Sequence, residues 1–234
     1  MKKNIYLFAT VLIIFSGCKK NEIKREALAT VSVLNVVIDG KVARLNTALR
    51  DSCLNMDYKH FSILAKDDSP LKLYASGLQS ITYYNQSLRA KSGDIYSLFL
   101  TGTHSSPESV LIKETIPEYP SEEVINVRLI NLVPESVPLS LTLGNKPTEN
   151  VFSNIGYKQV SEFKTIPFPT ILPDGGKLFQ IRDASGNILT TYDMPDFGTV
   201  STSSSRHRNI TVAVKGVNGG TGDKAFGVVV LPHY

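Results

Sequence analysis

The feature of this sequence that most constrains its fold is an internal repeat. Residues 31–37, VSVLNVV, recur as residues 127–133, VRLINLV, with apolar residues at matching places and the asparagine kept. A serine–glycine pair at residues 76–77 recurs at residues 185–186, so the segments follow the same order about a hundred residues further along the chain. This repeated order predicts that one structural unit occurs twice.

The repeated segments have the composition of β-strands. They are short, rich in β-branched and aromatic residues, and bounded by Gly, Pro, Asp, Asn and Ser; residues 96–102, YSLFLTG, and 210–216, ITVAVKG, are examples. Residues 47–56 carry only a weak helical pattern. Because a half-buried sheet must cover its apolar face with a second sheet, we expect an all-β protein with two tandem immunoglobulin-like β-sandwich domains.

The join between the two units is expected where prolines and acidic residues gather. Residues 117–123, PEYPSEE, suit a short and stiff linker. The sequence therefore predicts a first sandwich (27–118) and a second sandwich (123–234).

The N-terminus has the pattern of a secretion signal. Two lysines precede an apolar run at residues 5–15 in which only Thr10 is polar. A membrane-spanning helix needs about 20 apolar residues, so this run is too short for a permanent span. It ends at Phe15-Ser16-Gly17-Cys18, which resembles the lipobox of bacterial lipoproteins. The alternatives are an ordinary signal peptide that happens to contain a cysteine, or an uncleaved anchor.

The lipobox resemblance implies a location and a first partner. It implies that residues 1–17 are a signal peptide cleaved before Cys18 and that residues 18–26 form a lipidated N-terminus and tether. Diacylglycerol on the Cys18 thiol would then bring the chain into contact with a membrane. Lys19 differs from the aspartate that holds some bacterial lipoproteins at the inner membrane, which favours the outer membrane. We expect the folded part to face the periplasm or the cell surface.

A second resemblance concerns the repeat itself. Residues 127–141, VRLINLVPESVPLSL, resemble the opening of the bacterial domain of unknown function 4397 family. Gly93-Asp94-Ile95-Tyr96 and the strand ending at Gly102 are similar to a later strand of that family. The resemblance implies two copies of a structural domain, and it implies no activity or ligand.

Charge and cysteine content exclude some classes of protein. Without residues 1–17 the chain keeps 23 basic and 21 acidic residues, a formal charge of +2, which argues against a nucleic-acid partner. Once Cys18 carries lipid, only Cys53 is left, so no intramolecular disulfide can form. We interpret Cys53 as a partly buried structural thiol rather than a nucleophile.

Motifs for catalysis or metal binding are absent from the sequence. The four histidines, His60, His104, His207 and His233, show no metal-ligand spacing. Residues 220–225, GTGDKA, fit a dinucleotide fingerprint formally, but a strand pattern follows them, which indicates a hairpin connection. The acidic residues Asp67, Asp68, Asp193 and Asp196 are explained by turns more simply than by calcium. We therefore predict no metal site and no cofactor.

These observations favour a binding or structural module over an enzyme. A rigid β scaffold presents recognition residues on its loops, and we select Gly219, Gly220, Thr221, Gly222 and Asp223 as the candidate binding loop for a protein or glycan partner. The alternative is an enzyme or transport accessory whose site forms between the two domains.

The lipobox generates the first testable prediction. Cells that express the full chain and are fed an alkynyl fatty acid should label the wild type strongly, because the acyl chains enter on Cys18. The Cys18→Ala variant should take up no label. Equal labelling of the two proteins would contradict the lipoprotein hypothesis.

Overall fold

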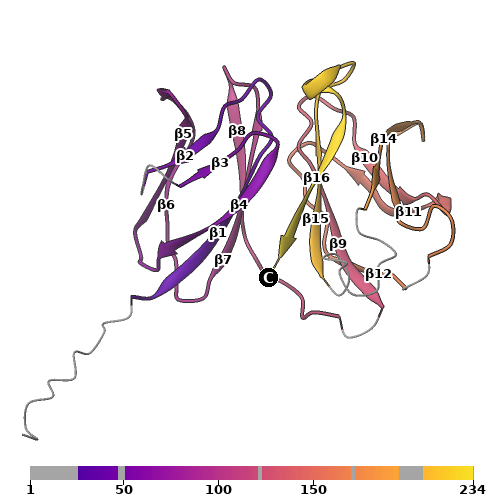
Figure 1. Cartoon of the computed structure of the whole chain (residues 1–234), viewed down its shortest axis with the longest axis horizontal. Helices are drawn as coiled ribbons and strands as arrows, with labels where there is room; N and C mark the ends of the chain where they lie inside the picture. Colours follow the sequence, from indigo (N-terminus) through magenta and orange to yellow (C-terminus); the bar gives the residue numbers. More distant parts are fainter. Residues whose placement is uncertain (1–25, 47–50, 121–122, 170–171, 195–207, 234) are drawn as a thin grey trace, which may run out of the picture.

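The protein is built almost entirely of β-strands, as expected from the sequence (Figure 1). The structure, a computed structural model, describes residues 26–46, 51–120, 123–169, 172–194 and 208–233. These residues form four sheets of four strands, one short 3₁₀ helix, η2 (Gly222–Lys224), and no α-helix. None of their helices has the length and apolar character needed to cross a membrane.

The first half contains eight strands in two sheets. One sheet has the order β4-β1-β7-β8 and the other the order β3-β2-β5-β6. Their bounds are β1 (Leu28–Asn35), β2 (Ala43–Leu45), β3 (Ser52–Cys53), β4 (Asp57–Leu64), β5 (Ser69–Ala75), β6 (Leu78–Leu88), β7 (Ile95–Gly102) and β8 (Pro107–Lys113).

The second half repeats this plan. Its sheets have the orders β12-β9-β15-β16 and β11-β10-β13-β14, which are the orders of the first half with eight added to each number. In both halves the first strand pairs in parallel with the seventh, β1 with β7 and β9 with β15. The bounds are β9 (Val124–Asn131), β10 (Leu139–Leu143), β11 (Lys146–Ile155), β12 (Lys164–Pro167), β13 (Leu178–Arg182), β14 (Ile188–Asp193), β15 (Asn209–Lys215) and β16 (Gly227–His233).

The asparagine shared by the two repeats has the same role in each. Asn35 and Asn131 are completely buried at the ends of β1 and β9. The Oδ1 atom of each accepts a hydrogen bond from the backbone N–H two residues later, on Val37 at 3.4 Å and on Val133 at 3.0 Å. The side chain therefore accepts a hydrogen bond from a backbone N–H just beyond the end of the strand.

Each half has its own apolar core, and a third core lies between the halves. The first core gathers residues of β1 to β7, including Val31, Leu73 and Leu98, and the second gathers residues of β9 to β15, including Val127 and Phe179. The third core draws on both halves, and its buried members are Leu34, Val36, Phe99, Ile130, Leu132, Ala213 and Leu231. We call this third cluster the joint core.

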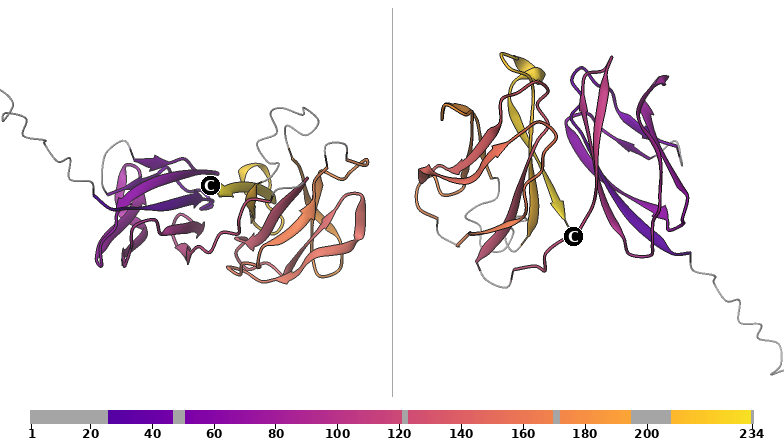
Figure 2. Two further views of the ribbon diagram at one scale, coloured as in Figure 1. Left: turned by 90° about the horizontal axis from the view of Figure 1, so that it is seen from below. Right: turned by 180° about the vertical axis from the view of Figure 1, so that it is seen from behind.

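The joint core exists because the two central sheets face each other. Figures 1 and 2 show β4-β1-β7-β8 beside β12-β9-β15-β16, with the remaining sheets outside. Side chains alternate along a strand, so Val33 points into the first core while Leu34 points into the joint core. A strand covered on both faces is apolar at most positions, which explains why five of the seven residues in each repeated segment are apolar.

The linker between the halves is bound into the same joint. The Glu114 carboxylate forms an ion pair with the Arg128 guanidinium, and the two side chains are 1% and 6% exposed. The Arg128 guanidinium also lies 4.7 Å from the centre of the Phe163 ring. The carbonyl of Pro117 accepts a hydrogen bond from Asn209 Nδ2 at 2.6 Å. The linker is therefore anchored at Glu114 and Pro117.

The weak helical pattern at residues 47–56 does not produce a helix in the described part of this segment. Strand β3 forms at Ser52–Cys53 and pairs with β2, because Cys53 packs into the first core. Residues 47–50 lie outside the described residues.

The joint core generates the second prediction. Phe99 is completely buried there, and replacing a core Phe by Ala costs about 3–5 kcal/mol. Urea unfolding of Phe99→Ala, followed by circular dichroism, should show a loss of that order. The control Val137→Ala, at a side chain that is 53% exposed, should change the free energy of unfolding by less than about 0.5 kcal/mol. Equal unfolding midpoints for Phe99→Ala and wild type would contradict the prediction.

Candidate functional site

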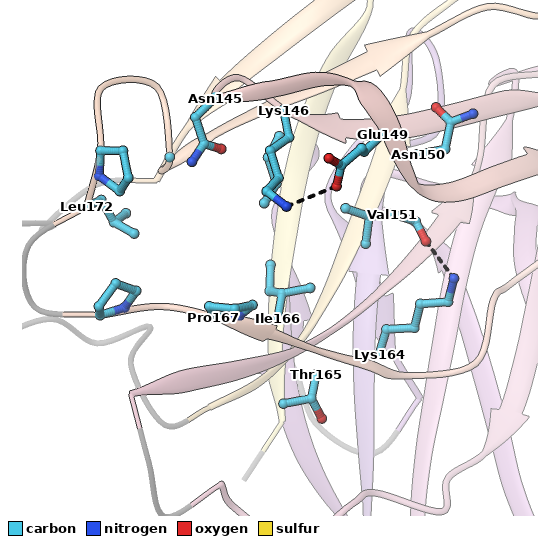
Figure 3. A pocket seen from close by; sticks show the side chains of 14 residues that line it. Asn145, Lys146, Glu149, Asn150, Val151, Lys164, Thr165, Ile166, Pro167 and Leu172 are labelled. Carbon is cyan, nitrogen blue, oxygen red and sulfur yellow. Dashed lines mark hydrogen bonds and ion pairs between the residues drawn. The ribbon is translucent and has the colours of Figure 1, made fainter.

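A groove of about 480 Å³ lies on the second half between strands β11 and β12 (Figure 3). Binding sites for small ligands have volumes of about 300–1,000 Å³, so the groove is large enough for a ligand. Strand β11 ends one sheet of this half and β12 ends the other. The groove therefore lies at the side of the second half where the two sheets present their edges.

The pairing of β11 with β10 explains the shape of this edge. Thr142 pairs with Asn150 and the next residue, Leu143, pairs with Lys146, so one step along β10 corresponds to four steps along β11. Val151 has no partner on β10, because its neighbours Asn150 and Phe152 pair with the consecutive residues Thr142 and Leu141. Such bulges bend a strand away from its partner. We infer that the bent edge forms one wall of the groove.

The groove has an apolar floor that continues into the second core. Ile166 is a buried member of that core, and Leu143, Val151 and Leu172 pack against it. Three prolines, Pro167, Pro169 and Pro173, extend the apolar wall. An apolar group of a ligand that enters the groove would leave water, which is favourable by roughly 25 cal/mol per Å².

The rim of the groove is polar and carries two lysines. Lys146 Nζ lies 3.0 Å from Glu149 Oε2, and both side chains are more than half exposed. Lys164 Nζ donates a hydrogen bond to the carbonyl oxygen of Val151 at 2.7 Å and lies 5.3 Å from the centre of the Phe152 ring. Within the described ranges, no carboxylate forms an ion pair with Lys164.

Two glycines bring two turns together beside the groove. A Cβ atom on Gly144 would lie 2.7 Å from the carbonyl oxygen of Gly175, which is closer than real contacts allow. Gly175 also has a φ of +76°, a conformation that favours glycine. The turn after β10 and the turn before β13 can approach this closely only because neither residue has a side chain.

The lining of the groove has two lysines, Lys146 and Lys164, and one threonine, Thr165, among its reactive side chains. It contains one carboxylate, Glu149, and no histidine, cysteine or serine. In the part of the chain that the structure describes, no group of three or more metal-ligating side chains occurs.

The candidate loop at residues 219–223 lies apart from the groove lining. It connects β15 to β16 and includes the start of η2, and Gly219, Thr221, Gly222 and Asp223 are exposed while Gly220 is half-buried. None of the five residues lines the groove. Just after the loop, Lys224 Nζ lies 2.8 Å from Asp39 Oδ2 of the first half. The loop is thus placed next to the joint between the halves.

The two cysteines have different positions relative to the structure. Cys18 lies outside the described residues. Cys53 is 1% exposed, and its Sγ donates to the carbonyl oxygens of Asp57 at 3.3 Å and Val33 at 3.5 Å. Burial raises the pKa of the Cys53 thiol to about 12, so the reactive thiolate is strongly disfavoured. Cys53 is a structural thiol, as the sequence predicts.

The acidic residues considered for calcium lie in separate places. Asp67 and Asp68 form the turn between β4 and β5. Asp193 Oδ1 lies 3.3 Å from Lys177 Nζ, and Asp196 lies outside the described residues.

A second, smaller pocket of about 180 Å³ lies between the halves. It is lined by His60 and His233, together with Thr30, Ser32, Ile95 and Ile116. Ser32 Oγ and His60 Nδ1 are 2.7 Å apart, and so are Thr211 Oγ1 and His233 Nε2. Burial lowers the pKa of both imidazoles, and that of His233 falls to about 4. Both histidines are therefore neutral at pH 7. Of the other two, His104 lies just after β7 and His207 lies outside the described residues.

Sequence reasoning missed the groove. One signal was present, because the stretch from β10 to β12 (139–167) is longer than the corresponding stretch from β2 to β4 (43–64). Extra length within one copy of a repeat indicates an added surface feature, but it does not say which side chains meet there.

Comparison with known proteins gives no further guide to the site. No protein-family model matches the chain, and no curated protein matches it.

The buried His233 generates the third prediction. Its pKa of about 4 lies below the ordinary value of 6.5, chiefly because of burial and secondly because of the positive charge on Arg128. As the pH falls from 6.5 to 4, the unfolded chain therefore takes up the proton first, and the free energy of unfolding should fall by up to about 3 kcal/mol. Urea unfolding at a series of pH values measures this loss.

Two variants separate His233 from the other titrating groups. His233→Asn keeps a side-chain group that can bond Thr211, and it should lose most of the slope between pH 6.5 and 4. His60, whose pKa is also lowered by burial, adds a slope of the same sign in every protein. His60→Asn should keep the part of the slope that His233 contributes. An unchanged slope in His233→Asn would contradict the prediction.

Proposed function

We propose that this chain is the precursor of a lipid-anchored cell-envelope protein whose folded part binds a protein or glycan and catalyses no reaction. The observation that carries the proposal is the groove between β11 and β12, with its apolar floor and its polar rim. Pockets of this composition select ligands by shape and by a few polar contacts.

The proposal includes the domain organisation and the location. Each half would be an immunoglobulin-like β-sandwich of the kind that the domain of unknown function 4397 resemblance implies, and the matching strand orders and separate cores support this reading. Residues 1–17 would direct secretion, and lipid on Cys18 would hold the protein at the outer membrane, facing the periplasm or the cell surface.

A second candidate function is an enzyme or transport accessory with a site between the halves. The pocket lined by His60 and His233 favours it, because two imidazoles there come from different halves. Its volume of about 180 Å³ is below the range of about 300–1,000 Å³ typical of ligand sites. We therefore rank it second.

The fourth prediction tests binding through the groove. The full chain in detergent is screened on a glycan array and against purified envelope proteins. Glu149→Trp places a large ring at the groove, so it should weaken binding of any partner found by about tenfold or more. Thr148→Trp, at the adjacent exposed position of the same strand and outside the groove lining, should bind as the wild type does.

Three further variants distinguish the alternatives. Loss of binding in Thr221→Trp but not in Glu149→Trp would assign the partner to the loop at residues 219–223 and contradict the groove. Hydrolysis of an envelope polysaccharide or peptide that disappears in His60→Ala or His233→Ala would overturn the binding-only proposal and support an enzyme.

A further inference from the structure

We propose that the groove binds an extended peptide segment of a partner protein, in which branched apolar residues flank an aspartate or glutamate. This inference rests on the proposed binding function and names its ligand. It follows from the floor of the groove, the charge at its rim and the polar groups that have no partner there.

The floor favours apolar side chains and disfavours sugars. Leu143, Val151, Ile166 and Leu172 provide aliphatic surface, and no aromatic ring lines the groove. Sugar-binding surfaces commonly rely on stacking against large aromatic faces, which this groove lacks. Aliphatic side chains of a peptide would lose water against the floor instead.

The charge at the rim favours an acidic residue. Lys164 extends from β12 across the groove to β11, where its ammonium group bonds the neutral carbonyl of Val151 (Figure 3). Of the three charged residues in the lining, two are lysines and one is Glu149, which pairs with Lys146. A ligand carboxylate would form a stronger, charge-assisted hydrogen bond with Lys164 than the carbonyl does. The groove is thus complementary to one negative charge.

The rim also offers groups that fit a peptide backbone. Asn145 and Asn150 line the groove, are exposed, and make no side-chain hydrogen bond within the described residues. An asparagine amide presents one acceptor and two donors, which matches the donor and acceptor of a peptide group. Because bulges interrupt β11, the peptide would be held by these side chains rather than added as a continuous strand.

The corresponding edge of the first half provides an internal comparison. There β3 has only two residues, and Cys53 Sγ donates to the carbonyl of Asp57 on β4. Strands β3 and β4 occupy the same places in the first half as β11 and β12 in the second. The contact therefore joins the two sheets at the edge where the second half has its groove. The groove therefore follows from the long and bulged β11 of the second half.

The experiment pans the full chain in detergent against a phage-displayed library of random linear peptides. Enriched sequences should combine Val, Ile or Leu with an adjacent Asp or Glu. The affinity of the most enriched peptide, measured by fluorescence polarisation, should fall about tenfold or more in Lys164→Met and recover in Lys164→Arg. Glu149→Trp should abolish binding although it makes the groove more positive, and Thr148→Trp should change the affinity less than about twofold.

The outcomes separate this inference from the proposed function. Enriched peptides without an acidic residue, bound equally by Lys164→Met, would overturn it. If no peptide is enriched but a glycan binds the wild type and not Glu149→Trp, the peptide ligand is wrong and the proposed binding function still stands. Binding of neither class would overturn both. Circular dichroism and thermal unfolding of each variant confirm that a loss of binding does not reflect a loss of fold.

Discussion

The structure depends on the burial of both faces of its two central sheets. One face of each sheet covers the core of its own half, and the other face forms the joint core with the opposite half. The side chains of the ion pair between Arg128 and Glu114 are buried as well. A buried ion pair must be well hydrogen-bonded to offset its desolvation, and Thr211 Oγ1, 2.7 Å from Arg128 Nε, supplies a further acceptor. Because Glu114 belongs to the linker, the linker is part of the packing between the halves.

Because the joint core is formed by the central sheets, the outer sheets and their edges can differ between the two halves. Both copies follow one strand order, yet the first closes its edge through Cys53, whereas the second lengthens the strand at that place. A bulged edge strand changes the surface without changing the sheet order or the core behind it. In this way one fold, used twice, presents the groove at this edge of its second copy.

The polar groups at the two hollow sites are in different environments. Between the halves His233 is buried and His60 is half-buried, and burial lowers the pKa of both imidazoles, which disfavours a positive charge there. At the groove the polar groups lie at an exposed rim, where Lys146 and Lys164 stay in contact with water. Recognition of a charged partner costs less free energy at the groove, since no buried charge must be created there.

The sequence by itself determined the β character of the chain, the repeat and the role of Cys53. These features depend on local patterns, such as β-branched runs between turn residues, or on a residue count, and both can be read without the fold. It also aligned Asn35 with Asn131, which the structure places at equivalent strand ends. Only the tertiary structure decided that Leu34 and Ile130 meet in a joint core, because an apolar residue does not indicate which surface will cover it. The groove likewise required the structure, since the pairing of Leu143 with Lys146 is set by how β10 and β11 align across the sheet, and not by the residues of either strand alone.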